Sequence, residues 1–235
     1  MKANIYLIPS PLGTGTIDAV LSDYVKKIIN KIDYYIVENV RTARRFLKKA
    51  GIQTLIGDLE FMILDKHTQP QELEVFLLPI SKNKDIGIIS EAGVPCIADP
   101  GAEIVKIAHK KNIRVIPLVG PSSILLALMA SGLNGQNFAF AGYLPIQTRN
   151  RTEKIKFLEN RSVKENQSQI FMETPYRNQK LLEDILKTCW SDTKLCIAAD
   201  ITLTTEFIKT KTIQEWKANI PDIHKRPTIF IIQGG

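Results

Sequence analysis

IGIISEAGVPCIADPG, residues 86–101, decides how this chain can fold. Its first half is a β-branched apolar run of the length that a buried parallel strand needs. Its second half cannot form a helix, because Gly93, Pro95, Pro100 and Gly101 interrupt it. A buried strand that leads into a rigid loop is therefore predicted. Ligands in open α/β sheets bind beyond the carboxyl ends of strands, which makes this loop a candidate site; an ordinary turn is the alternative.

Strands and helices alternate through the first half of the chain. Besides the run at 86–101, apolar or β-branched runs predict strands at 4–8, 34–38, 60–64 and 114–118. Helical spacing is found at 20–29, 39–51, 71–78, 102–111 and 119–132. Pro79 is expected to end the third of these helices. The alternation predicts an α/β fold with a parallel, doubly wound sheet.

The second half of the chain has a different order and spacing of predicted strands and helices. Strands are predicted at 138–143, 169–173, 195–199, 206–209 and 228–232, and helices at 145–161, 181–186 and 213–220. Several of the strands are separated by short loops, so antiparallel neighbours are expected. Within 119–132, a Gly-Pro turn and two serines lead into a strongly apolar helix, which is expected to be buried between layers. We place the domain boundary there, with one α/β domain over 1–118 and a second over 119–235.

Composition and charge narrow the classes of function. The 235 residues carry 31 Lys and Arg against 24 Asp and Glu, a formal net charge of +7, which permits a polyanionic partner such as RNA without requiring one. The three cysteines and three histidines form no CxxC pair and no ligand cluster, so no metal site and no disulfide framework is predicted. The chain shows no run long enough for a membrane span or a signal peptide, so we expect a cytoplasmic protein with no membrane partner.

Two segments concentrate positive charge. The helix predicted at 39–51 holds five cations in nine positions, and the basic loop and helix at 145–161 hold five more. A solvated surface explains such clusters as readily as contact with phosphates does. If the two segments bind RNA, the expected contacts are Arg44, Arg45, Lys48, Arg149 and Arg151.

The loop after the first strand, SPLGTGT at 10–16, is a second candidate for ligand contact. Its two glycines let the backbone approach a ligand closely. It contains neither a GxGxxG pattern nor a P-loop lysine, so on its own it is a weak indication of a nucleotide site.

Six motifs, read together, carry a resemblance to a known family. They are IPSPLG (8–13), VENVRTARRFL (37–47), SEAGVPCIADPG (90–101), IPLVGPSS (116–123), SGLNGQNFAFAGYLP (131–145) and IFMETPYR (170–177). In this order and spacing they closely resemble the tetrapyrrole (corrin and porphyrin) methylase superfamily, and within it the branch of small-subunit ribosomal RNA methyltransferases. The resemblance covers nearly the whole chain.

The resemblance implies a two-domain class III methyltransferase, with a mainly parallel sheet in the N-terminal domain and a mixed sheet in the C-terminal domain. Members of the family bind S-adenosylmethionine in a cleft between the domains, usually as homodimers. Those of this branch methylate the ribose 2′-hydroxyl of a cytidine, so ribosomal RNA or the small ribosomal subunit is the expected partner. Carried over to the matching positions, the cofactor contacts are Pro11, Gly13, Ala92, Gly93, Val94, Ile97, Ser122, Ser123, Met172 and Pro227.

Methyl transfer to a ribose also needs assistance at the acceptor oxygen. A hydroxyl is a poor nucleophile until its proton is drawn off by a base, or until a cation favours the alkoxide. The catalytic candidates are Glu38, Arg41 and Glu173, with Glu91 beside them. A purely structural ion pair between Glu38 and Arg41 explains those two residues equally well.

The sequence departs from the family pattern mainly on the acceptor side. Asn39 and Val40 replace an Asp-Thr pair, Glu91 replaces an aspartate, and AADITLTTE (198–206) replaces an Arg-Glu-Leu-Thr-Lys pattern. The cofactor loops are largely kept, so the methyl donor is better specified than the acceptor. Two alternatives stay open: a methyltransferase that acts on a tetrapyrrole or another small molecule, and a cofactor-binding member that has lost catalysis.

Overall fold

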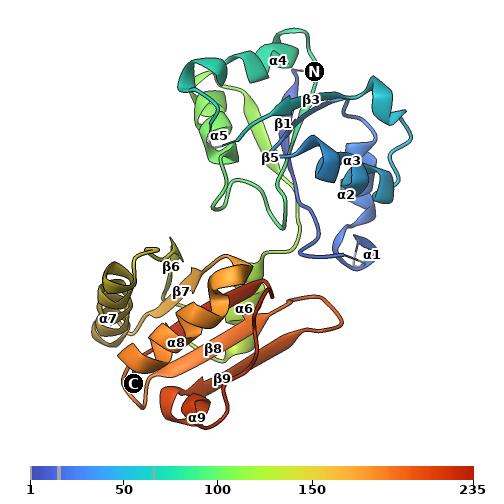
Figure 1. Ribbon diagram of the computed structural model, residues 1–235. Coiled ribbons are helices and arrows are strands. Elements are labelled where there is room, and N and C mark those ends of the chain that lie inside the picture. Colours follow the sequence, from blue (N-terminus) through green and yellow to red (C-terminus); the bar gives the residue numbers. More distant parts are fainter. Residues whose placement is uncertain (1, 15–16, 66) are drawn as a thin grey trace. The chain divides into compact units, whose positions relative to one another are not determined.

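The computed structural model describes residues 2–14, 17–65 and 67–235, so Gly15 and Thr16 of the first loop lie outside the described residues. The chain divides into two compact units, Met1–Ser122 and Ser123–Gly235, each a five-stranded sheet with helices packed against it (Figure 1). The expected division after residue 118 falls shortly before this boundary. Among the described residues, no helix has both the length and the apolar character that a membrane span requires.

The N-terminal unit is built on a sheet whose strands are all parallel, as predicted. The strands stand in the order β3-β2-β4-β1-β5. Their bounds are β1 (Asn4–Ile8), β2 (Tyr34–Val37), β3 (Glu60–Ile63), β4 (Ile86–Ile89) and β5 (Arg114–Pro117). All residues of β4, the central strand, are buried. A strand that is covered on both faces needs apolar residues throughout, and this explains its β-branched sequence.

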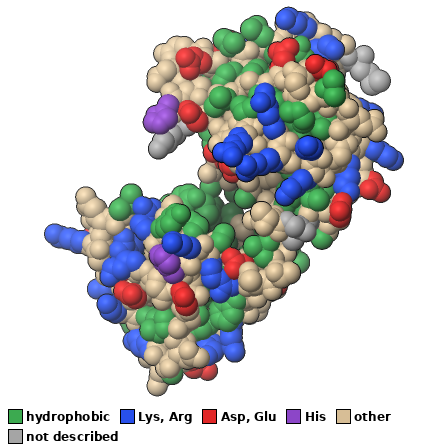
Figure 2. Space-filling view, turned by 45° about the vertical axis from the view of Figure 1, so that its right-hand side comes forward, with side chains coloured by type: hydrophobic (Ala, Val, Ile, Leu, Met, Phe, Trp, Pro, Cys, Tyr) green, Lys and Arg blue, Asp and Glu red, His purple; other side chains and the backbone are tan. Residues whose placement is uncertain are grey.

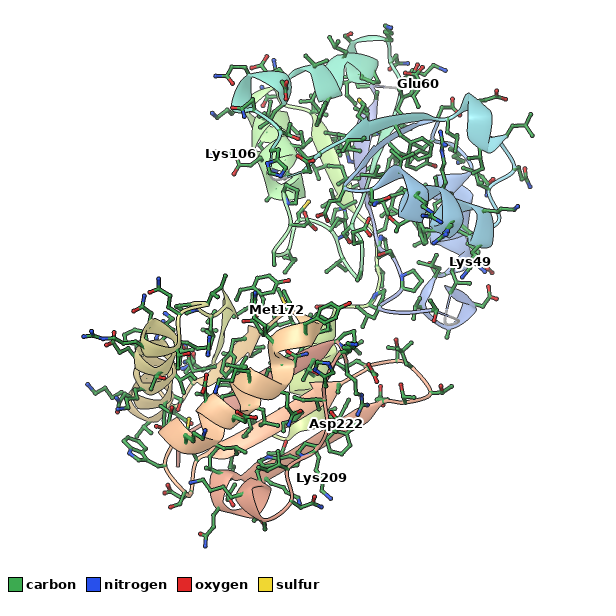
Figure 3. The ribbon with its side chains drawn as sticks, viewed as in Figure 1. Lys49, Glu60, Lys106, Met172, Lys209 and Asp222 are labelled. Atoms are coloured by element: carbon green, nitrogen blue, oxygen red, sulfur yellow. The ribbon has the colours of Figure 1, made fainter. Side chains whose placement is uncertain are left out.

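Helices cover both faces of this sheet. One face carries α1 (Ile17–Val20), α2 (Asp23–Ile29) and α3 (Val40–Lys49), and the other carries α4 (Leu78–Ser81) and α5 (Gly101–Lys110). Figure 3 shows the arrangement at Lys49 of α3 and Lys106 of α5, which lie on opposite sides of the sheet. The neighbouring strands β1 and β4 therefore send the chain to opposite faces. Such a divergence opens a crevice at the carboxyl ends of the strands, where ligands bind in this fold class.

Two helices expected in this unit are broken. The helix predicted over 20–29 is split, because Ser22 caps the start of α2 and its Oγ accepts a hydrogen bond from the Val25 N–H at 3.4 Å. The helix predicted over 71–78 is wrong: the chain there makes the short 3₁₀ turns Pro70–Glu72 and Val75–Leu77. Pro79 lies in the first turn of α4 and does not end a helix, since proline is tolerated where no backbone N–H is needed.

The C-terminal unit contains a mixed sheet in the order β6-β7-β10-β8-β9, as predicted. Its strands are β6 (Phe138–Tyr143), β7 (Ser168–Met172), β8 (Lys194–Ala199), β9 (Phe207–Thr212) and β10 (Thr228–Gln233). Its helices are α6 (Ser123–Ser131), α7 (Thr148–Lys164), α8 (Asn178–Thr188) and α9 (Ile213–Ala218). Only β6 and β7 pair in parallel. The core between sheet and helices contains Phe171, Phe230 and Trp216.

Helix α6 is less buried than its apolar sequence predicts. It packs against β8, β9 and β10 through one face that includes Ala127 and Leu128. Leu125 and Met129 are 50% and 78% exposed. The expectation that the whole helix lies between layers is therefore wrong, and the outward side of α6 is an apolar surface.

The two edges of the C-terminal sheet differ from its centre. Edge strand β9 carries Lys209 and Lys211, and the Lys211 Nζ lies 5.0 Å from the centre of the Trp216 ring. At the other edge, the pairing of β6 with β7 shifts in register between Phe140 and Tyr143. Gly142, within that irregularity, has a φ of +68°, a conformation that glycine adopts without strain.

Helices α7 and α8 are joined by a buried ion pair between Arg151 and Asp184, whose side chains are 5% and 6% exposed. The Arg151 Nε donates to Asp184 Oδ2 at 2.9 Å, and its Nη1 and Nη2 donate to the Ile146 carbonyl and to Thr148 Oγ1. The prediction that Arg151 contacts phosphates is thus wrong, because its guanidinium is enclosed and already bonded. Arg149, two residues earlier, is exposed and pairs with Glu153 at 3.3 Å.

Replacing Arg151 should destabilise the C-terminal unit. Arg151→Met leaves Asp184 buried without its partner, so we expect the free energy of unfolding to fall by about 3–5 kcal/mol. The matched variant Arg149→Met removes an exposed pair and should change it by less than about 1 kcal/mol. Urea unfolding followed by tryptophan fluorescence measures both, because Trp190 and Trp216 both belong to this unit. Equal stabilities of the two variants would contradict the assignment.

Candidate functional site

The loops that follow β1 and β4 are joined by backbone hydrogen bonds beyond the ends of their strands. The Ser10 N–H donates to the Gly93 carbonyl at 2.9 Å, and the Gly93 N–H donates to the Ser10 carbonyl at 3.1 Å. Two buried hydroxyls reinforce the junction, because Ser10 Oγ donates to the Ser90 carbonyl and Ser90 Oγ donates to the Gly93 carbonyl. The two diverging loops are therefore held together at their bases.

A third loop, which follows β5, approaches the same place. A Cβ added to Gly120 would lie 2.1 Å from the Pro9 Cβ, so only glycine fits there. Gly93 has a φ of +75°, and a Cβ at this position would lie 3.1 Å from the Pro121 carbonyl oxygen. Ser122 follows that proline. Of the predicted cofactor residues, Pro11, Gly13, Gly93 and Ser122 are thus on three loops that meet at one edge of the sheet.

The loop after Gly93 owes its shape to unusual backbone conformations and one carboxylate. Cys96 and Ala98 have φ values of +69° and +60°. Asp99 holds the loop, since its two oxygens accept hydrogen bonds from the N–H groups of Cys96 and Gly101, both at 2.8 Å. Burial, and then the charge of Asp99, raise the pKa of the Cys96 thiol to about 12, so this thiol stays protonated at neutral pH. Ile97, a predicted cofactor contact, is 51% exposed on this loop.

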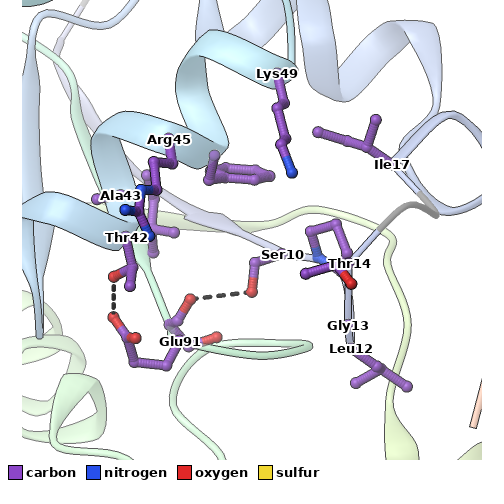
Figure 4. Close-up of a pocket in the computed structure, with 14 residues that line it drawn as sticks. Ser10, Leu12, Gly13, Thr14, Ile17, Thr42, Ala43, Arg45, Lys49 and Glu91 are labelled. Carbon is purple, nitrogen blue, oxygen red and sulfur yellow. Dashed lines mark hydrogen bonds between the residues drawn. The ribbon is translucent and has the colours of Figure 1, made fainter. Parts of the chain in front are cut away.

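Three carboxylates gather where β2 and β4 end. Burial raises the pKa of Glu38, the charges of Asp99 and Glu91 raise it further, and a hydrogen bond from the Glu91 N–H opposes them. Burial also raises the pKa of Asp99, against its two backbone hydrogen bonds. Glu91 is tied to α3, because Thr42 Oγ1 donates to its Oε1 at 2.6 Å (Figure 4). Arg41 makes no ion pair with Glu38 in the described chain, so the structural pairing considered for these two residues is not formed.

A pocket of about 450 Å³ lies between α3 and the first loop. It is lined by Ser10, Pro11, Leu12, Gly13, Thr14, Ile17, Thr42, Ala43, Arg45, Phe46, Lys49, Ile89, Ser90 and Glu91. Figure 4 shows Arg45 and Lys49 extending from α3, and Thr14 on the first loop across from them. Pro11 and Gly13 of the predicted cofactor set and Arg45 of the predicted RNA-binding set therefore line one cavity.

Helix α3 has three distinct sides. Ala43 and Leu47 enter the core. Thr42, Arg45, Phe46 and Lys49, spaced i, i+3, i+4 and i+7, line the pocket. Arg41, Arg44 and Lys48 face outward and are exposed. Thr42 and Phe46 belong to no predicted site, although the helical spacing that unites them with Arg45 and Lys49 is visible in the sequence.

Ala92 and Val94 flank Gly93 on the loop after β4, and the other predicted cofactor contacts belong to the C-terminal unit. Ser123 opens α6, Met172 pairs with Ile229 in the sheet, and the Pro227 carbonyl accepts from the Asp200 N–H at 2.9 Å.

Glu173, at the end of β7, has a side chain that is only 1% exposed. Its Oε1 accepts from the Arg177 Nη2 at 2.6 Å and from the Thr174 N–H at 2.7 Å. Burial alone would raise the pKa of Glu173, but these bonds outweigh burial and hold the pKa below its ordinary value. A carboxylate that is bonded and ionised in this way is a weak proton acceptor. The geometry favours a structural role for Glu173.

Metal ligands do not gather in the part of the chain that the structure describes. No group of three or more His, Cys, Asp or Glu side chains there is arranged to hold an ion. The site therefore consists of backbone-rich loops, a carboxylate cluster and the cations of α3.

Comparisons with known proteins relate the chain to methyltransferases. No family model matches the chain. The chain is 27% identical over 236 residues to a protein from Escherichia coli O157:H7 named ribosomal RNA small subunit methyltransferase I, covering 99% of this chain and 78% of that one. It is 29% identical over 237 residues to a protein of the same name from Buchnera aphidicola subsp. Schizaphis graminum, covering 98% and 78%.

A solved structure shares the fold. The crystal structure of the methyltransferase CobJ matches with a TM-score of 0.65 over 99% of this chain and 95% of that one, at 14% identity. The two sheets, the nearly full-length relatives and this shared fold lead to one conclusion: the chain is a methyltransferase with a two-domain α/β fold like that of CobJ.

Proposed function

We propose that the protein transfers the methyl group of S-adenosylmethionine to a ribose 2′-hydroxyl of small-subunit ribosomal RNA. The relatives that match nearly all of the chain are named for this RNA. The structural observation that supports an RNA acceptor is the position of α3, whose unneutralised cations lie beside the loops expected to bind the donor. An RNA acceptor of this kind is consistent with a cytoplasmic enzyme.

The donor is expected on the backbone-rich loops. S-adenosylmethionine presents an adenosine and an amino-acid tail, which suit close backbone approach and apolar contacts. The loop positions Ala92, Gly93, Val94 and Ile97 offer both, since Gly93 lacks a side chain and Ile97 is exposed. The protein's main task is then to hold the acceptor oxygen, the methyl carbon and the sulfur in line.

We assign the proton acceptor to Glu38. In the proposed step the 2′-oxygen forms a bond to the methyl carbon while the carbon–sulfur bond breaks, giving S-adenosylhomocysteine, and the hydroxyl proton passes to the Glu38 carboxylate. A carboxylate whose pKa is raised toward neutrality is the better base, and Glu38 has such a pKa whereas Glu173 does not.

The acceptor strand is expected along the outward cations of α3. Arg41, Arg44 and Lys48 have no carboxylate partner among the described residues, and α3 itself contains no acidic residue. Arg44 is held over the Phe61 ring, with its Cζ 5.3 Å from the ring centre. Figure 2 shows lysine and arginine side chains gathered on one face of the N-terminal unit. Such a surface binds a phosphate backbone in a salt-dependent way.

We also propose a homodimer, the usual state in the family. The exposed apolar residues Leu125 and Met129 of α6 are side chains that an interface would cover. Light scattering that gives the mass of a single chain would exclude it.

Incubation with radiolabelled S-adenosylmethionine and small ribosomal subunits tests the proposal directly. We expect label in the RNA with the natural sequence and none with Gly93→Val, because the added side chain meets Leu12 and the Pro121 carbonyl and should prevent donor binding. Gly57→Val is the matched control, since a Cβ at Gly57 meets nothing within 4 Å. Donor binding without any transfer would identify a member that has lost catalysis, and full donor affinity in Gly93→Val would refute the loop assignment.

Glu38→Gln should lower the rate constant of methyl transfer by about 100-fold or more and leave donor affinity nearly unchanged. Glu38 can accept the proton only while it is ionised, so activity should fall as the pH drops through its pKa. Because that pKa is raised, the fall should occur at a higher pH than with an ordinary glutamate. A pH–rate profile of the natural sequence should show this acid limb, and Glu38→Gln should lack it. If the variant keeps the limb and the rate, Glu38 is not the base.

Removing two outward cations should weaken RNA binding and its dependence on salt. In Arg44→Gln/Lys48→Gln, two lost phosphate contacts should flatten the slope of log K against log salt by about 1.5, with donor affinity intact. Lys106→Gln/Lys110→Gln is the control, because α5 lies on the opposite face of the sheet (Figure 3). Filter binding at several salt concentrations measures the slopes, and equal slopes in both double variants would contradict an RNA-binding α3.

A further inference from the structure

The pocket between α3 and the first loop has a composition that the donor does not explain. Its volume of about 450 Å³ is in the range of small-molecule sites. Its described lining includes Pro11 and Gly13 but none of Ala92, Gly93 or Val94. The loop at the centre of the predicted donor site therefore lies outside this cavity.

The charges of the pocket favour an anion. Arg45 and Lys49 stand one helical turn apart, and neither has an ion-pair partner in the described part of the chain. The carboxylate of the pocket, Glu91, accepts a hydrogen bond from Thr42 at 2.6 Å and sits at the end of β4. Two unpaired cations repel a sulfonium, whereas they attract a phosphate.

Apolar groups lie next to these cations. Phe46 follows Arg45 directly in the sequence, and its side chain is half-buried. It lines the same cavity as Leu12 and Ile17. An aromatic ring beside a phosphate-binding pair is the combination that proteins use for single-stranded nucleic acid, where bases stack on the ring and cations follow the backbone.

We infer that this pocket binds one nucleotide of the acceptor RNA, with Phe46 against the base and Arg45 and Lys49 on a phosphate. The inference rests on the proposed function and names the part of the substrate that enters the protein. The bound nucleotide lies next to Glu91, close to the carboxylates at the ends of β2 and β4. A nucleotide in this position has to be unstacked from its neighbours, as enzymes that modify nucleotides require.

Calorimetry with the intact protein tests the pocket without catalysis. The probes are cytidine 5′-monophosphate, cytidine, inorganic phosphate and a short single-stranded ribo-oligonucleotide. Lys49→Met should weaken binding of the monophosphate and of the oligonucleotide by about tenfold, and Phe46→Leu should weaken both without affecting phosphate. Lys110→Met on α5 and Phe157→Leu on α7 are the controls, because both side chains are exposed and lie outside the pocket. Affinity for S-adenosylhomocysteine should stay within about twofold in all four variants.

Each outcome either supports or refutes the nucleotide pocket. If the Lys49 and Phe46 variants bind the probes as the natural sequence does, the pocket is not a nucleotide site. A parallel loss of S-adenosylhomocysteine affinity would assign the cavity to the donor and overturn the inference, and binding of the monophosphate with no binding of the oligonucleotide would refute an RNA ligand.

The proposed function and the nucleotide pocket can be refuted independently of each other. Absence of methyl transfer to small subunits, with monophosphate and oligonucleotide binding that depends on Lys49, would leave the nucleotide pocket standing and remove the methylation of this RNA. Methyl transfer that proceeds unchanged in Lys49→Met and Phe46→Leu would support the proposed function and refute the nucleotide pocket.

Discussion

The site depends on the backbone pairing of Ser10 with Gly93. The connections after β1 and β4 leave toward opposite faces of the sheet, so the crevice between them would widen if nothing joined them. Two backbone hydrogen bonds, each contributing about 1 kcal/mol, extend the strand pairing into the loops. The buried hydroxyls of Ser10 and Ser90 add two more. This junction fixes Glu91, which lies two residues before Gly93, and the wall of the pocket that contains Ser10 and Ser90. It also fixes Gly93, against which the third loop packs.

Charge is distributed around this junction in two different ways. The carboxylates at the ends of β2 and β4 are half-buried or bonded, and burial raises the pKa values of Glu38 and Asp99. The cations of α3 stand on exposed side chains and keep their charge unneutralised. These two arrangements match the two proposed roles, since a raised pKa favours proton exchange and exposed cations favour contact with a polyanion. The same short region of sheet and helix thus provides both kinds of electrostatics.

The sequence allowed the sheets and their loops to be predicted, because β-branched runs mark buried strands and Gly/Pro clusters mark the turns after them. It could not separate Arg149 from Arg151, which stand two residues apart on one basic helix. The difference arises from Asp184, 33 residues away, which reaches Arg151 only once α7 and α8 pack. Likewise, the sequence of α3 does not show which of its cations line the pocket, because Thr14 and Ile17 of another segment form the opposite wall. The broken helix near Pro79 reflects local turn chemistry, which helical periodicity does not detect.

The edges of the C-terminal sheet bear on how the protein behaves at high concentration. An open edge strand offers unpaired backbone groups to other chains and is a common starting point for aggregation. On β9, Lys209 and Lys211 place charge along that edge, so a second strand cannot add without burying it. On β6, the register shift near Gly142 interrupts the regular pattern that intermolecular pairing needs. Both edges thus keep the sheet at five strands and protect the protein against edge-to-edge association between copies of the chain.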